Sequence, residues 1–353
     1  MNQRAILYAL LSALLFGLST PAAKALLGST DPALLAGLLY CGAGLGVAIL
    51  RRLPRALSRM PARQEARLSR AELPWLAGAI VAGGIVGPTL LMAGLARTDA
   101  STASLLLTLE GVATALMAWF VFRENFDRRI ALGMACLVAG AAILSWSGHP
   151  TLDGAVGPLA IVAACIAWGL DNNLTRKVSL ADPLQIVELK GLVAGPCNIG
   201  LGLLAGASLP PAPAILGAGI VGFLGYGLSL ALFVLGLRHL GTARTGAYFS
   251  TAPFFGTAAA VVALGEPVTV QLLAAAGLMG VGVWLHISEK HEHLHLHDPM
   301  DHAHAHTHDD HHRHAHGPDD PPEEPHSHWH RHGRLVHSHG HTPDAHHRHG
   351  HRP

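Results

Sequence analysis

The sequence is poor in charge, in aromatic residues and in cysteine. Charged residues make up 13% of the chain and aromatic residues 5%, and only 4 of the 353 residues are cysteines. The cysteines have no CxxC spacing, so neither a disulfide framework nor a thiolate metal site is indicated. We expect them to be small packing residues within apolar segments. They are Cys41, Cys136, Cys165 and Cys197.

The apolar part of the chain, residues 1–290, also lacks the common catalytic motifs. It contains no GxxxxGK[ST], no HExxH and no GxSxG, so a P-loop nucleotidase, a zinc protease and an α/β-hydrolase are not indicated. A formal net charge of +1 leaves no excess of positive charge for nucleic acid. The sequence therefore predicts neither an enzyme nor a nucleic-acid partner, and transport would draw on a gradient rather than on nucleotide hydrolysis.

Long apolar windows fill this part of the chain. Hydrophobic residues make up 50% of the sequence, and about ten windows approach the roughly 20 apolar residues that cross a bilayer. The fourth window covers Ala100–Phe122, the eighth Pro213–Leu237 and the ninth Gly241–Leu264. These windows predict an all-α membrane protein of about ten transmembrane helices.

Arginine and lysine accumulate in the loops on one side of the predicted helices. The loop from Arg51 to Glu72 is the richest, and the loops on the opposite side hold little beyond Arg97. Basic loops stay in the cytoplasm. We therefore predict a multi-pass protein of a bacterial-type inner (plasma) membrane with both termini cytoplasmic.

The two halves of the apolar part resemble each other. Phe16-Gly17-Leu18 returns as Trp168-Gly169-Leu170, and Asp31-Pro32 returns as Asp182-Pro183. Further matches are Gly94-Leu95 with Gly236-Leu237 and Glu124 with Glu266. We predict a first repeat over 1–148, a second over 149–290 and a separate tail over 291–353. An odd number of spans in each half gives the halves opposite topology, which places a binding site at their interface near the bilayer midplane.

These segments, with Ala252-Pro253-Phe254 and Gly265-Glu266, resemble the EamA-type members of the drug/metabolite transporter superfamily. The resemblance covers residues 5–287 and implies ten helices in two inverted five-helix repeats. The first half departs from the pattern, with Glu110-Gly111 where the second has Ala252-Pro253. Members of the superfamily carry amino acids, sugars, nucleotide precursors or drugs, so the resemblance leaves the substrate open.

Ionisable residues inside apolar windows are the default functional candidates, because burying them in a membrane is costly. Glu110, in the fourth window, is either a substrate or proton site or a structural partner of a basic residue. Glu188 and Lys190 lie two residues apart, so they face different sides of a helix and need partners elsewhere, such as Asp171 or Arg244. A structural salt-bridge network is the alternative to a transport role. The predicted substrate or proton pathway comprises Glu110, Asp171, Glu188, Lys190, Arg244 and Tyr248.

The tail after residue 290 holds 23 of the 26 histidines, many in HxHxH alternation. Neutral imidazole is a good ligand for Zn, Ni, Co and Cu, and a segment with so few apolar residues is expected to be disordered. The alternative is a solubilising low-complexity tail. The predicted metal ligands are His291, His293, His295, His297, His302, His304, His306, His308, His326, His328, His330, His332, His337, His339 and His341.

Together these features predict a secondary transporter that exports a small metabolite, amino acid or drug-like compound by alternating access. It would need no cofactor for transport, and the tail would be an accessory metal-binding segment. One alternative is a divalent-metal exporter for Zn, Ni or Co, whose tail loads or senses the ion. Another is a membrane-anchored metal store without transport. The expected partners are a small-molecule substrate, the lipid bilayer and divalent ions on the tail, in a monomer or homodimer.

Overall fold

The structure is a computed structural model. It describes residues 3–57, 68–121, 128–146, 152–178, 181–287, 292–297, 300–306, 326–332 and 335–340. Within these ranges, residues up to 287 form helices and short turns, and the described parts of the tail form strands.

The first half of the helical part contains seven α-helices and one π-helix, η1. Their order is α1 Gln3–Leu26, α2 Pro32–Leu57, α3 Leu73–Ala79, η1 Ile80–Val86, α4 Gly87–Ala96, α5 Ala100–Leu106, α6 Leu109–Phe120 and α7 Arg128–Ser145. The segment α3–η1–α4 is one continuous span with a π-helical centre, and α5 with α6 forms the next span.

The second half repeats this order with one π-helix, η2. Its elements are α8 Leu152–Val178, α9 Pro183–Leu204, α10 Ala212–Val221, η2 Gly222–Leu228, α11 Ser229–Phe249, α12 Ala252–Leu264 and α13 Val270–Ile287. The predicted boundary between Leu237 and Gly241 is wrong, because α11 runs through it without interruption. No proline falls between these residues to break the helix.

Among the described residues, seven helical segments are long and apolar enough to cross a membrane. Three shorter apolar helices complete the set: Ala131–Ser145, Ala252–Leu264 and Val270–Leu285. A multi-pass, all-helical membrane body is therefore confirmed. The count of ten spans stays a prediction.

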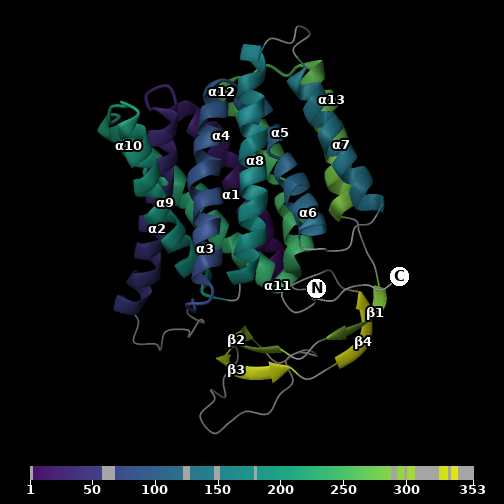
Figure 1. Cartoon of the computed structure of the whole chain (residues 1–353). Coiled ribbons are helices and arrows are strands. Elements are labelled where there is room, and N and C mark those ends of the chain that lie inside the picture. Colours follow the sequence, from purple (N-terminus) through teal and green to yellow (C-terminus); the bar gives the residue numbers. More distant parts are fainter. Residues whose placement is uncertain are drawn as a thin grey trace.

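The first helix of each half packs against helices of the other half (Figure 1). Helix α1 packs on α11 and α12 of the second half, and α8 packs on α4 and α6 of the first. The end of α1 lies beside the start of α8, because Lys24 Nζ donates to Thr98 O at 2.8 Å and Gly157 closely approaches Thr98. The first helices of the two halves therefore run in opposite directions.

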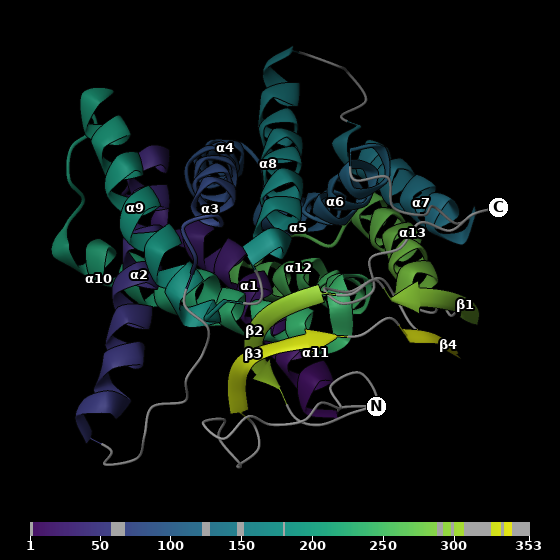
Figure 2. The same cartoon turned by 60° about the horizontal axis from the view of Figure 1, so that its bottom comes forward.

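Different helices form the two edges of the bundle (Figures 1 and 2). Helices α2, α9 and α10 form one edge, and α7 with α13 forms the other. At the first edge, glycines allow α2 and α9 to approach closely: a Cβ on Gly191 would lie 2.5 Å from Gly44 Cα.

Matching aspartates precede and cap these two helices. Asp31 Oδ1 accepts a hydrogen bond from Ala33 N, and Asp182 Oδ1 accepts one from Leu184 N, both at 2.9 Å.

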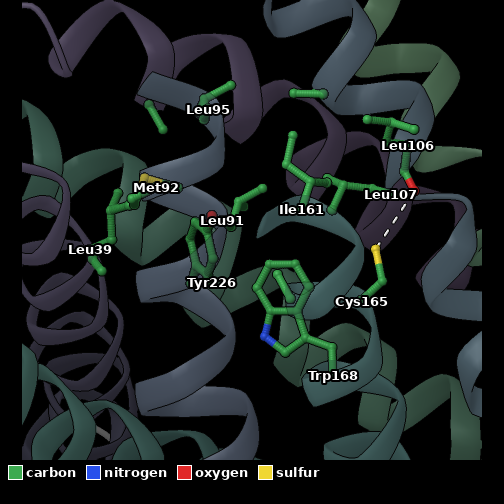
Figure 3. Packing of buried hydrophobic residues seen from close by; sticks show 14 of the residues in the cluster. Leu39, Leu91, Met92, Leu95, Leu106, Leu107, Ile161, Cys165, Trp168 and Tyr226 are labelled. Carbon is green, nitrogen blue, oxygen red and sulfur yellow. Dashed lines mark hydrogen bonds between the residues drawn. The ribbon is translucent and has the colours of Figure 1, made fainter. Parts of the chain in front are cut away.

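The apolar core lies between the halves (Figure 3). Leu91, Met92 and Leu106 are fully buried there, and Trp168 is almost fully buried. The Cys165 thiol, also fully buried, donates to Leu106 O at 3.6 Å. Cys165 is therefore a packing residue as expected, and all the cysteines are free thiols.

The described segments of the tail differ from the expectation of disorder. Strand β1 (Glu292–His297) pairs antiparallel with β4 (Leu335–Gly340), and β2 (Met300–His306) pairs antiparallel with β3 (His326–His332). The physical reason is the alternation that also suggested metal binding, because a period of two puts every second residue on the same face of a strand. Low apolar content therefore did not predict the strand structure of these segments.

Candidate functional site

Two tightened helical turns, one from each half, approach each other at the centre of the bundle. In the first, Thr108 Oγ1 donates to Leu105 O at 2.8 Å; in the second, Thr251 Oγ1 donates to Tyr248 O at 2.7 Å. The backbone there uses i→i+3 hydrogen bonds, a form that often marks hinges within helices. A Cβ on Gly111 would lie 3.6 Å from Ser250 Oγ, so the two turns are neighbours.

Glu110 lies in the first turn of α6, directly after the first tightened turn. Asn172 Nδ2 on α8 donates to Glu110 Oε1 at 2.8 Å and to Thr114 Oγ1 at 3.2 Å. Taken as a whole residue, Glu110 is half-buried. Among the described residues, the ion pairs involve Asp171, Asp182 and Glu188 but not Glu110. Among the described residues, the side chain bonded to the Glu110 carboxylate is a neutral amide, and both roles of Glu110 stay predictions.

Asp171 and Lys190 form a buried ion pair between α8 and α9. Lys190 Nζ lies 2.6 Å from Asp171 Oδ1 and 2.8 Å from Oδ2, and it also donates to Thr175 Oγ1 at 3.2 Å. Lys190 is 1% exposed and Asp171 6%. The expectation that Asp171 supplies a partner for one of the α9 charges is confirmed.

Gly83 in η1 leaves room for the Asp171 side chain of this pair. A Cβ on Gly83 would lie 2.5 Å from Asp171 Cβ and still closer to its carboxylate. The carbonyl oxygen of Gly83 accepts two hydrogen bonds, from Tyr40 Oη at 2.6 Å and Trp168 Nε1 at 2.9 Å. Single π-turns are common at functional sites because they shift hydrogen bonding out of the α-helical register.

The π-helices were not anticipated from the sequence. The one available signal is the density of glycine in Gly83-Gly84 and in Gly222, Gly225 and Gly227. Since η1 and η2 occupy corresponding places in the third span of each half, the two π-segments are a paired feature of the fold.

An aromatic cluster lies next to these polar groups. The ring of Phe16 is 5.8 Å from Trp168, 5.7 Å from Tyr226 and 5.3 Å from Phe249, and Tyr40 is 5.6 Å from Tyr226. The Tyr226 hydroxyl on η2 is buried close to Ser19 of α1. Aromatic faces beside a carboxylate can bind a molecule that is both apolar and polar.

Glu188 belongs to a separate network at the end of the bundle where α1 begins. Its carboxylate lies 3.0 Å from Arg51 Nη1 and 2.5 Å from Arg52 Nη2, at the end of α2. Arg51 also pairs with Asp182 at 3.0 Å, so the network joins α2 to the start of α9. The structure thus separates Glu188 from the central group of Glu110, Asp171 and Lys190.

The remaining predicted residues are placed as follows. Arg244 and Tyr248 lie on α11, and Tyr248 is part of the second tightened turn. His291, His308 and His341 lie outside the described residues. The other predicted metal ligands lie on β1 to β4. A role for any of these residues in transport or metal binding stays a prediction.

The family comparison agrees with this duplicated bundle. A model of the EamA-like transporter family matches the chain twice, over residues 3–146 and 155–288. The chain belongs to this family. The resemblance inferred from the sequence is therefore confirmed, and the body of this protein is that of an EamA-like transporter.

Two relatives illustrate the range of the family. An "Uncharacterized transporter" of Methanothermobacter thermautotrophicus is 27% identical over 285 residues, which are 76% of this chain and 82% of that protein. A "Probable amino-acid metabolite efflux pump" of Salmonella typhimurium is 26% identical over 208 residues, 53% of this chain and 67% of that protein. A crystal structure at 20% identity shares the fold, with a TM-score of 0.62 over 81% of this chain and 96% of that one.

Proposed function

We propose that this EamA-like protein is a secondary transporter that exports a small amphipathic metabolite bearing an amino group, such as an amino acid or a related compound. It works by alternating access in a bacterial-type inner membrane, with both termini cytoplasmic. The observation that carries the proposal is Glu110, a half-buried residue whose described partner is an amide, placed beside the aromatic cluster where the two halves meet.

The chemistry of this site favours a substrate with a positive charge and an apolar part. A carboxylate with no basic partner among the described side chains can attract an ammonium group, and Phe16, Tyr226 and Phe249 offer ring surface to an apolar side chain. The name of the Salmonella relative, an amino-acid metabolite efflux pump, is consistent with this substrate class. Glu110 would bind either the substrate amine or a coupling proton.

The proposed motion uses the two tightened turns and the two π-helices. Each pair has one member in each half, and segments with mixed hydrogen bonding bend more easily than regular α-helix. Alternating access then consists of one half rocking against the other around Glu110 and the aromatic cluster.

Transport in proteoliposomes tests the proposal. Wild type, Glu110→Gln and the surface control Glu72→Gln, whose carboxylate accepts from Ser69 N in an exposed turn, would be reconstituted at equal density. Counterflow of radiolabelled amino acids and amines measures binding and exchange, and uptake driven by a pH gradient measures coupling. We expect Glu72→Gln to behave as wild type.

The two assays separate the two roles of Glu110. Loss of both activities in Glu110→Gln indicates substrate binding, whereas loss of gradient-driven uptake alone indicates proton coupling. Wild-type rates in both assays would remove Glu110 from the mechanism. Flux of Zn²⁺ or Ni²⁺ instead of any amine or amino acid would favour the metal-exporter alternative.

The tail is proposed to be an accessory segment that binds divalent metal ions. Ending the chain after Lys290 removes all of the tail histidines while leaving every helix. We expect metabolite flux in metal-free buffer to be retained in this truncated chain. Loss of that flux would make the tail part of the transport machinery.

A further inference from the structure

The two strand pairs of the tail place histidine opposite histidine. In β1 and β4, His293 is the register partner of His339, and His295 is the partner of His337. In β2 and β3 the pairs are His302 with His330, His304 with His328 and His306 with His326. Of the histidines on these strands, only His297 and His332 pair with another residue type.

Both pairs follow one continuous register. His297 pairs with Leu335. Met300, three residues after His297, pairs with His332, which is three residues before Leu335. If the pairing register shifted by one residue, no histidine on these strands would lie opposite another histidine, because histidine occupies every second position. The other face of β1 and β4 pairs Leu296 with Val336, which favours the observed register.

Consecutive histidine pairs have the spacing of a four-ligand metal site. Directly opposite residues have Cβ atoms about 4.5–5.5 Å apart, and alternate residues on one strand are roughly 7 Å apart. Two neighbouring register pairs on one face therefore place four histidine positions within this spacing, and four is the number of ligands that tetrahedral zinc takes. His302, His304, His328 and His330 form one such set, and His293, His295, His337 and His339 form another.

We propose that the tail binds divalent transition-metal ions, such as Zn²⁺, between its strands, through these two sets of cross-strand histidines. The inference rests on the metal binding proposed above and adds that the ligands come from strands distant in sequence. Among side chains that the structure describes, no group of three metal-ligating residues gathers, so the strand register is what assigns these sites.

The consequence is that metal binding and strand pairing stabilise each other. An ion held by β2 and β3 closes the chain between them, so its binding free energy also stabilises the hairpin. A flexible tract binding through neighbouring HxH units would not depend on the register at all. The two modes therefore predict different effects of moving histidines by one position.

The test exchanges neighbours on β2 without changing composition. The β2 exchange variant carries Ala303→His, His304→Ala, Ala305→His and His306→Ala, which moves two imidazoles to the other face and keeps an HxH unit in the sequence. A control makes the same kind of exchange between the strands. It carries Arg313→His, His314→Arg, Ala315→His and His316→Ala.

A compensating variant restores the pairing on the other face. It adds Ser327→His, His328→Ser, Trp329→His and His330→Trp on β3 to the β2 exchange, so that position 303 again faces histidine at 329, and 305 faces it at 327. Zn²⁺ titration of the full-length proteins in lipid nanodiscs, against a chelator of known affinity, measures each binding step.

We expect the β2 exchange to remove the tightest Zn²⁺ binding step at that strand pair, the control to keep it, and the compensating variant to regain it. Equal binding by all variants would overturn the cross-strand sites while leaving metal binding itself intact. Failure of the wild type to bind Zn²⁺ would overturn both. Neither result bears on metabolite flux, so the transport proposal is judged separately.

Discussion

Lys190→Met leaves the carboxylate of Asp171 buried without its counter-ion. In the wild type the two side chains are 9% exposed or less, and Lys190 Nζ contacts both carboxylate oxygens at 2.6 and 2.8 Å. Removing one partner of such a buried pair costs about 3–5 kcal/mol. Thr175 still donates to Asp171 Oδ1 at 2.8 Å, so we expect the lower part of this range, about 3 kcal/mol.

The double variant Asp171→Asn/Lys190→Met separates loss of packing from loss of charge balance. Asparagine keeps an oxygen that accepts from Thr175, and methionine fills much of the volume of lysine. Because no charge then remains buried, the double variant should be less destabilised than Lys190→Met by about 2 kcal/mol or more.

Unfolding of the purified protein by SDS in mixed micelles, followed by tryptophan fluorescence, measures these free energies. Glu72→Gln serves as the surface control and should be within about 0.5 kcal/mol of wild type. If the double variant is as unstable as the sum of its two single variants, the residues are not coupled and the buried pair contributes nothing specific.

Further predictions follow from the same contacts. Gly83→Ala should destabilise the protein strongly because its Cβ would collide with Asp171, whereas Gly200→Ala, with no atom within 4 Å of the added Cβ, should be tolerated; the same SDS titration compares them. Glu188→Gln, which removes a carboxylate bonded to two arginines, should cost about 1.5–3 kcal/mol in that assay, and no change would contradict the network. Zn²⁺ affinity of the full chain, measured by titration, should collapse below about pH 6 because protonated imidazole cannot coordinate, and an affinity independent of pH would exclude histidine ligands. A reporter fused after Ile287 should be active in the cytoplasm, and activity restricted to the periplasm would overturn the topology.

The helical body follows from local properties of the sequence. Apolar windows near the length of a bilayer span can satisfy their backbone hydrogen bonds within a membrane only as helices or closed barrels, and long windows favour helices. The duplication was also readable, since Phe16-Gly17 and Trp168-Gly169 lie within equivalent helices, α1 and α8, that pack on the opposite half. Asp31 and Asp182 were recognisable as matching helix starts for the same reason, because capping is a local interaction.

The partners of the charged residues depended on tertiary structure. The sequence showed that Glu188 and Lys190 needed partners. The packing of α9 against α2 and η1, and of η1 against α8, decided that Lys190 pairs with Asp171 and Glu188 with Arg51 and Arg52. Such pairs join residues distant in the chain, and several pairings satisfy the same composition.

The π-helices and the strand register were also decided beyond the local sequence. The shift at η1 is stabilised by Tyr40 and Trp168, which donate to Gly83 O from two other helices, and no spacing rule connects these three residues. In the tail, the histidine alternation determined the face on which each imidazole lies, but only the pairing of β1 with β4 and β2 with β3 determined which histidines are opposite one another. Periodicity along one segment follows from the sequence alone because it is set by bond geometry, whereas contacts between segments depend on how the whole chain packs.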